Sequence, residues 1–396
     1  MLYDVIIVGA GPIGLLLANI LGNFNIKTII FEKEKSKSLG SKAIGISPPS
    51  LSILQKYNLD EIFISKGIKV KDVIVHGTKH QLGHITFDKL SSKYNFILSI
   101  PQVETENILE GNLKKYNSVK LEKGKEVIAL SQLNQIEIKV LDKSTNKEEA
   151  FSSKYLCACD GNKSTVRNLL NIPFTGDRYK SVFLMADFVD KSGFDNEAHL
   201  FFTKKGPVES FPLPGKIRRW IVETKEFMQN PEKGFLESEV KKRIDINLSE
   251  SRKISESPFG VQHYIIKKYF KDMIFFCGDS AHVMSPIGGQ GMNTGFADAD
   301  FCANILNDFL KRGNCEAKTL VRYDRFRRKA AITATHRASL SMHIGIMKGL
   351  FISLMRNIII YLFVRIFKKM IPPFFSMLTI PYNFYKKTYF DTDLQD

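Results

Sequence analysis

The chain begins with a glycine pattern that can hold a dinucleotide. Gly9, Gly11 and Gly14 follow a buried strand predicted for residues 4–8, and Pro12 opens the helix that comes next. The first glycine permits a tight turn, the second lets a pyrophosphate approach the backbone, and the third lets the helix pack closely on the strand. The phosphates would then meet the positive end of the helix.

An acidic residue stands at the distance that this type of site requires. Glu32 ends the next predicted strand, residues 27–31, and Lys33 follows it directly. A carboxylate in this place can accept hydrogen bonds from the ribose hydroxyls of an adenine nucleotide. A lone glycine motif would be weak support, but strand, glycine turn, helix and acid together predict an α/β domain of Rossmann type.

Two further motifs follow predicted buried strands. Asp160-Gly161 comes after the strand at 155–159, and Gly278-Asp279 comes after the strand at 273–277. Carboxylates at the carboxyl ends of parallel strands can reach a ligand in the crevice there. The second motif continues from Pro286 to Gly295, before a helix predicted from Phe296. Its glycines can direct backbone N–H groups at an anion, such as the N1/O2 edge of a reduced flavin.

These three blocks, in this order, resemble the para-hydroxybenzoate hydroxylase-like family of single-component FAD monooxygenases, over about residues 1–340. The resemblance implies a Rossmann-like FAD-binding domain, an inserted mixed β-sheet substrate domain and non-covalent FAD. It implies that Glu32 holds the adenosine ribose, Asp279 the ribityl or pyrophosphate, and Asp160 both FAD and the nicotinamide nucleotide. The cofactor-binding candidates are Gly9, Gly11, Pro12, Gly14, Glu32, Lys33, Lys42, Gln102, Asp160, Asp279, Pro286, Gly291, Met292 and Asn293.

One position departs from the family pattern. Where the family usually has Arg-Ala, this chain has Lys42-Ala43. Lysine keeps the positive charge but lacks the planar fork of arginine, so it cannot hold the cofactor in the same bidentate way.

The three blocks divide the chain discontinuously. We expect the FAD-binding domain at 1–75, 98–178 and 262–340, and the substrate domain at 76–97 and 179–261. Strand-like runs at 119–121, 126–130 and 135–141 predict an antiparallel insertion. Residues 341–396 form a basic, apolar, helical C-terminal region, in which Pro372-Pro373 is expected to end the helix.

The resemblance implies that the reaction is carried by the cofactor. Reduced flavin reacts with O2 to give the C4a-hydroperoxide, which hydroxylates an electron-rich ring. Because no second strand, glycine turn and helix unit follows, NAD(P)H would bind transiently as a co-substrate. A base would help to remove a phenolic proton. The candidates for this base are His199 and Glu209, on the predicted sheet of the substrate domain, and Phe211 and Trp220 are candidates for the pocket walls. The sequence leaves open which face of that sheet meets the flavin. His282 is more simply a structural histidine beside the cofactor turn.

Composition limits the partners. The chain has 396 residues and a formal net charge of +16, and twelve Lys/Arg but only one acid fall between residues 318 and 370. Five scattered cysteines, without metal-ligand spacing, argue against a disulfide framework or a metal site and for a cytoplasmic protein. No aromatic platform accompanies the positive charge, so we expect no nucleic acid.

The apolar stretch at 344–367 is interrupted by Lys348, Arg356 and Arg365, which argues against a membrane-spanning helix. It predicts either a helix packed under the flavin domain or a helix on an anionic membrane surface, with its basic side chains snorkelling. The location is then cytoplasmic, either free or peripheral on the inner face of the membrane.

The leading function is an FAD-dependent, NAD(P)H-dependent monooxygenase that hydroxylates an aromatic or other electron-rich small molecule, with the apolar tail favouring a lipophilic one. The alternatives are an isoprenoid-directed flavin reductase or epoxidase, and a non-redox lipid escort protein on an FAD fold. The flavin loop from Gly278 to Gly295 argues against the escort protein. A flavin halogenase is disfavoured because the Trp-x-Trp-x-Ile-Pro signature of that group is absent, and Trp220 is the only tryptophan.

Overall fold

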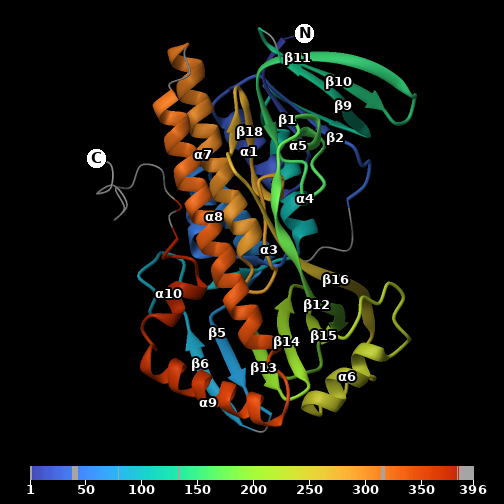
Figure 1. The fold of residues 1–396 in the computed structure, drawn as a ribbon, viewed down its shortest axis with the longest axis vertical. Helices are drawn as coiled ribbons and strands as arrows, with labels where there is room; N and C mark the ends of the chain where they lie inside the picture. Colours follow the sequence, from blue (N-terminus) through green and yellow to red (C-terminus); the bar gives the residue numbers. More distant parts are fainter. Residues whose placement is uncertain are drawn as a thin grey trace.

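A computed structural model describes residues 2–37, 43–78, 80–132, 134–313, 317–380 and 382. It contains two eight-stranded sheets, a three-stranded sheet and helices packed around them. One large sheet lies in the upper half of Figure 1 and the other in the lower half, and α8 (Ala317–Ile346) runs along both. The predicted α/β architecture is confirmed.

The upper sheet is the dinucleotide-binding sheet. Its main path runs β17-β18-β11-β1-β2-β8, and β1 pairs in parallel with both β2 and β11. The antiparallel strands β9 and β10 extend it beside β11. Its strands are β1 (Leu2–Val8), β2 (Thr28–Glu32), β8 (Val119–Lys123), β9 (Lys125–Gln132), β10 (Ile136–Asp142), β11 (Lys147–Ala158), β17 (Phe270–Lys271) and β18 (Ile274–Phe276).

The sequence interpretation was wrong for one strand of this sheet. Residues 119–121 belong to β8, which pairs in parallel with β2 and so continues the nucleotide-binding sheet. Only β9 and β10 form the antiparallel extension. A short apolar run predicts a strand but cannot identify its partner, because pairing depends on where the chain returns in space.

Helices cover the upper sheet and bury its apolar side chains. The sheet strands read as apolar runs because both faces are covered, as in other parallel sheets. α1 packs against α4 and α7, and α7 packs against α8. The helices of this half are α1 (Pro12–Asn23), α2 (Pro48–Lys56), α3 (Asp60–Lys66), α4 (Gln102–Leu113), α5 (Thr165–Leu169) and α7 (Gln290–Arg312).

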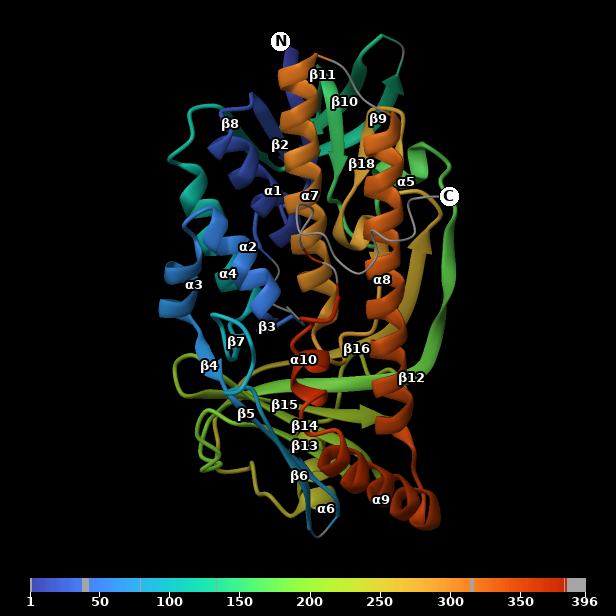
Figure 2. The same ribbon diagram turned by 90° about the vertical axis from the view of Figure 1, so that its left-hand side faces the viewer.

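The lower sheet has the order β19-β16-β12-β15-β14-β13-β5-β6. α6 (Phe235–Ile244) covers one face, and a small sheet of β3 (Gly45–Ile46), β4 (Ile68–Val70) and β7 (Ile97–Ser99) lies between the two halves (Figure 2). The strands are β5 (Asp72–His76), β6 (Gln81–Thr86), β12 (Phe174–Val189), β13 (Ala198–Thr203), β14 (Gly206–Leu213), β15 (Ile217–Thr224), β16 (Lys253–Ile266) and β19 (His282–Val283).

The C-terminal region does not form one continuous helix. α8 ends at Ile346, α9 spans Leu350–Ile366, and α10 spans Ile371–Phe375. Pro372 and Pro373 lie in the first turn of α10 rather than at the end of α9, where their fixed φ is tolerated, so that expectation was wrong. In Figures 1 and 2, α9 lies at the end of the molecule farthest from the upper sheet. Among the described residues, no helix has both the length and the apolar character needed to cross a bilayer.

Candidate active site

A cavity of about 1210 Å³ lies between the carboxyl ends of the upper sheet's parallel strands and one face of the lower sheet. It exceeds the size usual for a single small ligand, so it has room for a cofactor and a substrate together. The cofactor candidates that line it are Gly9, Gly11, Pro12, Glu32, Lys33, Gln102, Asp160, Asp279, Pro286, Gly291 and Met292. Lys42 lies outside the described residues.

The glycine turn has the geometry that a pyrophosphate site requires. Gly9 has a φ of +100°, and a Cβ there would clash with the carbonyl of Cys159. A Cβ on Gly14 would overlap the Gly9 carbonyl oxygen, so this glycine serves the close packing of α1 and does not line the cavity. A Cβ on Gly11 would meet nothing within 4 Å. The turn therefore leaves space beside the N-terminus of α1, which fits a phosphate group.

Glu32 is held at the end of β2 by the glycine turn. Its Oε2 accepts a hydrogen bond from the Ala10 backbone N–H over 2.8 Å, and its Oε1 accepts one from the Glu34 N–H over 2.9 Å. The carboxylate is fixed at the cavity wall, where its remaining lone pairs can accept ribose hydroxyl groups.

Asp160 has one oxygen in use and one without a partner. Its Oδ2 accepts a hydrogen bond from the Val166 N–H over 3.1 Å, while Oδ1 is buried with no partner among the described residues. Burial raises the pKa of this carboxyl above its ordinary value. An unpaired buried oxygen at the cavity wall is costly, and a hydroxyl group of a bound cofactor would satisfy it.

Asp298 and Arg327 support the turn that carries Asp279. Asp298 Oδ2 accepts hydrogen bonds from the Gly278 N–H over 3.0 Å and from His282 over 2.7 Å, and its Oδ1 pairs with Arg327 Nε over 2.7 Å. Burial opposes the charge of Asp298, but Arg327, His282 and the Gly278 N–H together hold its pKa below the ordinary value. His282 is fully buried and does not line the cavity, which agrees with a structural role.

Arg167 connects the second and third motifs. Its guanidinium donates to the Asn162 carbonyl over 2.6 Å and to the Ser280 carbonyl over 3.1 Å. The sequence interpretation did not assign Arg167, Asp298 or Arg327 to the site. A charged residue within an otherwise apolar helical run, as in Phe296-Ala-Asp298-Ala, was the signal available for Asp298.

The helix after the third motif begins earlier than expected. α7 starts at Gln290, so Gly291, Met292 and Asn293 lie in its first turn rather than in a loop before Phe296. Gly288 and Gly289 precede it with φ of +84° and +63°. Gly288, Gly289, Gly291 and Met292 line the cavity. The positive end of α7 therefore lies at the cavity wall, where the predicted electrostatic role of the motif requires it.

Asn293 does not line the cavity but fixes the loop around it. Its amide nitrogen donates to the carbonyls of Gly45, over 2.9 Å, and Gly289, over 2.6 Å, and its Oδ1 accepts from the Ser47 N–H over 2.8 Å. These bonds tie the start of α7 to the chain beside β3.

The strand register of the lower sheet determines which of the candidate residues line the cavity. Glu209 and Phe211 on β14 line the cavity with Phe183, Met185, Leu200, Ile221 and Phe259 from neighbouring strands. His199 and Trp220 project to the opposite face: His199 stacks on Phe194 at 3.7 Å between ring centroids, and Trp220 is packed beside α6. The expectation that these two residues belong to the pocket was wrong, because successive strand residues point to opposite faces and the sequence did not specify the register.

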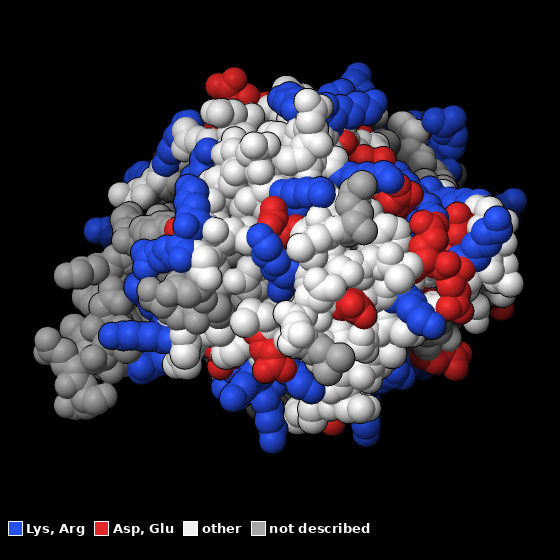
Figure 3. Space-filling model, turned by 90° about the horizontal axis from the view of Figure 1, so that it is seen from above, with Lys and Arg blue, Asp and Glu red and all other residues white. Residues whose placement is uncertain are grey.

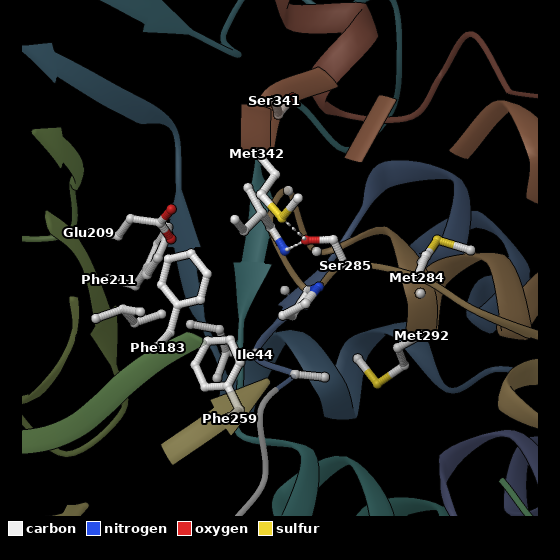
Figure 4. Close-up of a pocket in the computed structure, with 18 of the residues that line it drawn as sticks. Ile44, Phe183, Glu209, Phe211, Phe259, Met284, Ser285, Met292, Ser341 and Met342 are labelled. Carbon is white, nitrogen blue, oxygen red and sulfur yellow. Dashed lines mark hydrogen bonds between the residues drawn. The ribbon is translucent and has the colours of Figure 1, made fainter. Parts of the chain in front are cut away.

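The substrate half of the cavity has mostly apolar walls (Figure 4). The Phe183 and Phe259 rings are stacked, with centroids 5.4 Å apart and an interplanar angle of 14°. Met342 from α8 closes the cavity near Ser285, whose Oγ lies 3.9 Å from the Met342 sulfur. Apolar and aromatic walls of this kind favour an aromatic ligand.

Glu209 is the carboxylate in this apolar half. It has no hydrogen-bond or ion-pair partner among the described residues, and its accessible surface faces the cavity (Figure 4). Burial raises its pKa to about 7. Glu209 therefore changes charge near neutral pH, as a general acid or base requires.

The chain matches a known family over most of its length. The sequence model described as "FAD binding domain" matches residues 2–338. The chain is 31% identical to 6-methylpretetramide 4-monooxygenase of Streptomyces rimosus, over 81% of this chain and 58% of that protein. It is 26% identical to rifampicin monooxygenase of Streptomyces venezuelae, over 75% of this chain and 62% of that protein. The chain thus spans about three fifths of the length of these relatives.

A solved structure shares nearly the whole fold. p-Nitrophenol 4-monooxygenase from Pseudomonas putida superposes with a TM-score of 0.88 and 19% identity, covering 96% of this chain and 98% of that protein. The anhydrotetracycline hydroxylase from Streptomyces rimosus superposes with a TM-score of 0.79 and 23% identity, covering 98% and 78%. The chain therefore belongs to the FAD binding domain family. This membership agrees with the resemblance to para-hydroxybenzoate hydroxylase-like FAD monooxygenases.

Proposed function

We propose that the protein is an FAD-dependent monooxygenase that uses NAD(P)H and O2 to hydroxylate an aromatic, lipophilic small molecule. The observation that carries this proposal is the position of Glu209. It is a carboxylate with a pKa of about 7, set in an apolar, aromatic-walled cavity that also reaches the FAD-binding motifs. The relatives named above are monooxygenases or hydroxylases, which favours hydroxylation over an isoprenoid reductase, an epoxidase or a lipid escort protein.

The residues that would hold FAD come from four parts of the chain. Gly11 and the N-terminus of α1 would take the pyrophosphate, and Glu32 the adenosine ribose. The unpaired Oδ1 of Asp160 would accept a cofactor hydroxyl, and Asp279 would hold the ribityl chain or pyrophosphate. The other candidates that line this part of the cavity are Gly9, Pro12, Lys33, Gln102, Pro286, Gly291 and Met292.

FAD held by these residues would supply the activated oxygen after its reduction by NAD(P)H. The protein then has three tasks. Phe183, Phe259 and Phe211 hold the substrate ring and keep water out. Glu209 in its charged form accepts the phenolic proton, which raises the electron density of the ring for attack. The start of α7 would stabilise negative charge on a bound flavin.

The test begins with the purified FAD-loaded protein. Phenols of increasing apolar size are screened for stimulation of NADH and NADPH oxidation, and products are identified by mass spectrometry as carrying one added oxygen atom. We expect Glu209→Gln to bind FAD normally but to lose product formation by about 10²–10⁴-fold, the range of a general base. Glu197→Gln, which alters a glutamate beside His199 outside the cavity, is the matched control. Product formation by Glu209→Gln at the parent's rate would show that Glu209 is not the general base.

We also propose that the protein works at an anionic membrane surface, on the inner face of the membrane. The support is the C-terminal region, which combines exposed apolar side chains on α9 with exposed Arg365, Lys368 and Lys369. Apolar area and attraction to anionic lipid together determine the affinity of such interfacial helices.

A further inference from the structure

α9 presents an apolar face to solvent. Fourteen of the 21 large hydrophobic side chains that are exposed in the described chain lie between Met347 and Met370. Leu350 is 77% exposed, Ile366 69% and Met370 67%. A patch of this kind on one helix marks a surface that is covered in use, because scattered exposed hydrophobics are normal but a contiguous group is not.

The helix is firmly attached by its other face. Arg356 is buried and donates to the carbonyls of Met347 over 2.5 Å and Thr203 over 3.2 Å. Asn357 donates to the Phe202 carbonyl over 3.3 Å. α9 meets β6 so closely that a Cβ on Gly83 would overlap Val364. The exposed face is therefore a fixed surface of the folded protein.

Exposed basic side chains lie at both ends of this face. Arg365, Lys368 and Lys369 are exposed on α9 and the turn after it, and residues 341–380 contain no Asp or Glu. Lys204 and Lys205 are exposed beside the start of α9, where the Gly349 N–H donates to the Lys204 carbonyl. The opposite end of the molecule differs, since acidic and basic residues are interspersed there (Figure 3).

The cavity reaches the same surface. Ile359, Phe363, Phe367 and Met370 line the cavity and are also exposed to solvent. Ile371, Phe374 and Phe375 of α10 continue this lining inward, toward Phe87 and Val75 of the substrate sheet. One cavity, whose walls are mostly apolar, is thus lined both by side chains exposed at α9 and by Glu209.

We infer that the mouth of the cavity beside Phe367 and Met370 opens into the bilayer when α9 lies on an anionic membrane, so that a lipophilic substrate reaches Glu209 directly from lipid. This inference rests on the proposed function and adds the route of the substrate. An apolar molecule dissolved in a bilayer would otherwise have to cross water to reach a buried site. An apolar path removes that step, because the molecule stays in contact with apolar surface throughout.

The charge pattern favours a lipid surface over a second copy of the chain. A symmetric dimer through α9 would bring Arg365, Lys368 and Lys369 of both copies together without acidic residues from 341–380 to pair with them. An anionic bilayer supplies the opposite charge, and each basic residue near it contributes about 1 kcal/mol, or roughly fivefold in affinity.

The first measurement is sedimentation of the FAD-loaded protein with phosphatidylcholine vesicles, with or without 30 mol% phosphatidylglycerol. We expect binding that needs phosphatidylglycerol and weakens with salt. Lys368→Glu/Lys369→Glu should weaken it by at least about 30-fold. The matched control is Lys114→Glu/Lys115→Glu, an exposed lysine pair at the end of α4, which should bind as the parent does. A parent protein that ignores these vesicles, or that is a dimer through α9 in light scattering, would overturn the inference.

The second measurement follows uptake of a lipophilic probe. The flavin fluorescence is recorded after mixing with anionic vesicles that contain 4-nonylphenol, at saturating vesicle concentration, and separately with aqueous phenol. Met370→Glu should slow uptake from vesicles by roughly tenfold or more, because a carboxylate would stand in an apolar passage, while aqueous phenol should be unaffected. Leu350→Glu adds the same charge at an exposed apolar side chain, at the start of α9, but Leu350 does not line the cavity. Its uptake rate should therefore match that of the parent.

Equal slowing in Met370→Glu and Leu350→Glu, or probe uptake in the parent from water but not from vesicles, would show that the substrate does not enter through lipid. Neither measurement requires turnover. A failure of the proposed hydroxylation would therefore be seen separately, as absent product in the assay with phenols and NAD(P)H.

Discussion

Arg356 on α9 donates a hydrogen bond to the carbonyl oxygen of Thr203 on β13 over 3.2 Å, which joins the C-terminal region to the substrate sheet. The same guanidinium donates to the carbonyls of Met347 and Gly345 at the end of α8. Arg356 is only 2% exposed, so its side chain does not snorkel to a membrane, which was one of the two alternatives left open by the sequence. Its charge instead satisfies carbonyl groups at a helix C-terminus.

The first prediction is that Arg356→Ala destabilises the fold. Removing the guanidinium leaves buried carbonyls without donors, so the free energy of unfolding should fall by about 2–4 kcal/mol. Arg365→Ala, whose side chain is exposed and contacts the Tyr361 ring, should change it by less than about 0.5 kcal/mol. Denaturant unfolding of both variants gives the comparison. Equal stability of the two variants would mean that the Arg356 bonds contribute little.

The second prediction concerns the cofactor. The purified protein should be yellow, with one non-covalent FAD, and Asp279→Ala should weaken FAD binding by about 1.5–3 kcal/mol, because a hydrogen bond to a charged group is lost. Glu148→Ala on the outer part of β11 serves as the control. Fluorescence titration of the apoprotein measures both affinities, and an unchanged affinity in Asp279→Ala would place that side chain outside the FAD site.

The third prediction uses the raised pKa of Glu209. Product formation should rise with pH through about 7, where Glu209 loses its proton, and this rise should be absent from Glu209→Gln. Stability should change in the opposite direction. The folded state holds the Glu209 proton more tightly than the unfolded chain does. The free energy of unfolding should therefore fall as the pH rises from about 4.5 to 7.

Glu209→Gln should therefore have the same melting temperature as the parent at pH 4.5 and a higher one at pH 8. At pH 8 its free energy of unfolding should exceed that of the parent by about 1–3 kcal/mol. Scanning calorimetry at the two pH values measures it. A gain of equal size at both pH values would assign the effect to packing rather than to the charge of Glu209.

The fourth prediction concerns the order of binding. The described chain has one unit of strand, glycine turn and helix for a dinucleotide. We therefore expect the proposed reductant, NAD(P)H, to bind only transiently. Reduction of the bound FAD should be slow alone and accelerate when substrate fills the cavity and moves the flavin. Stopped-flow absorbance records the rate with and without substrate, and equal rates would contradict this coupling.

The sequence by itself determined the nucleotide-binding half of the protein. A strand, Gly9, Gly11, Gly14 and Glu32 form a local unit, in which each residue acts on its near neighbours in the chain. The steric demands of a tight turn leave little choice, as shown by the overlap that a Cβ on Gly14 would make with the Gly9 carbonyl. The Asp160 and Gly278-Asp279 motifs were recognisable for the same reason.

Only the tertiary structure decided which residues meet in the substrate half. Glu209 and His199 were equal candidates in the sequence, because an alternating strand has two faces and the chain does not state which face is buried. The pairing of β13, β14 and β15 places Glu209 in the cavity and His199 on the opposite face beside Phe194. The twelve basic residues between 318 and 370 are close in sequence but not in space. α8 is about 45 Å long, so the basic residues along it are separated from those at α9. Neighbours in the sequence determine local geometry. Which side chains line the cavity, and where basic side chains gather on the surface, depend on long-range packing.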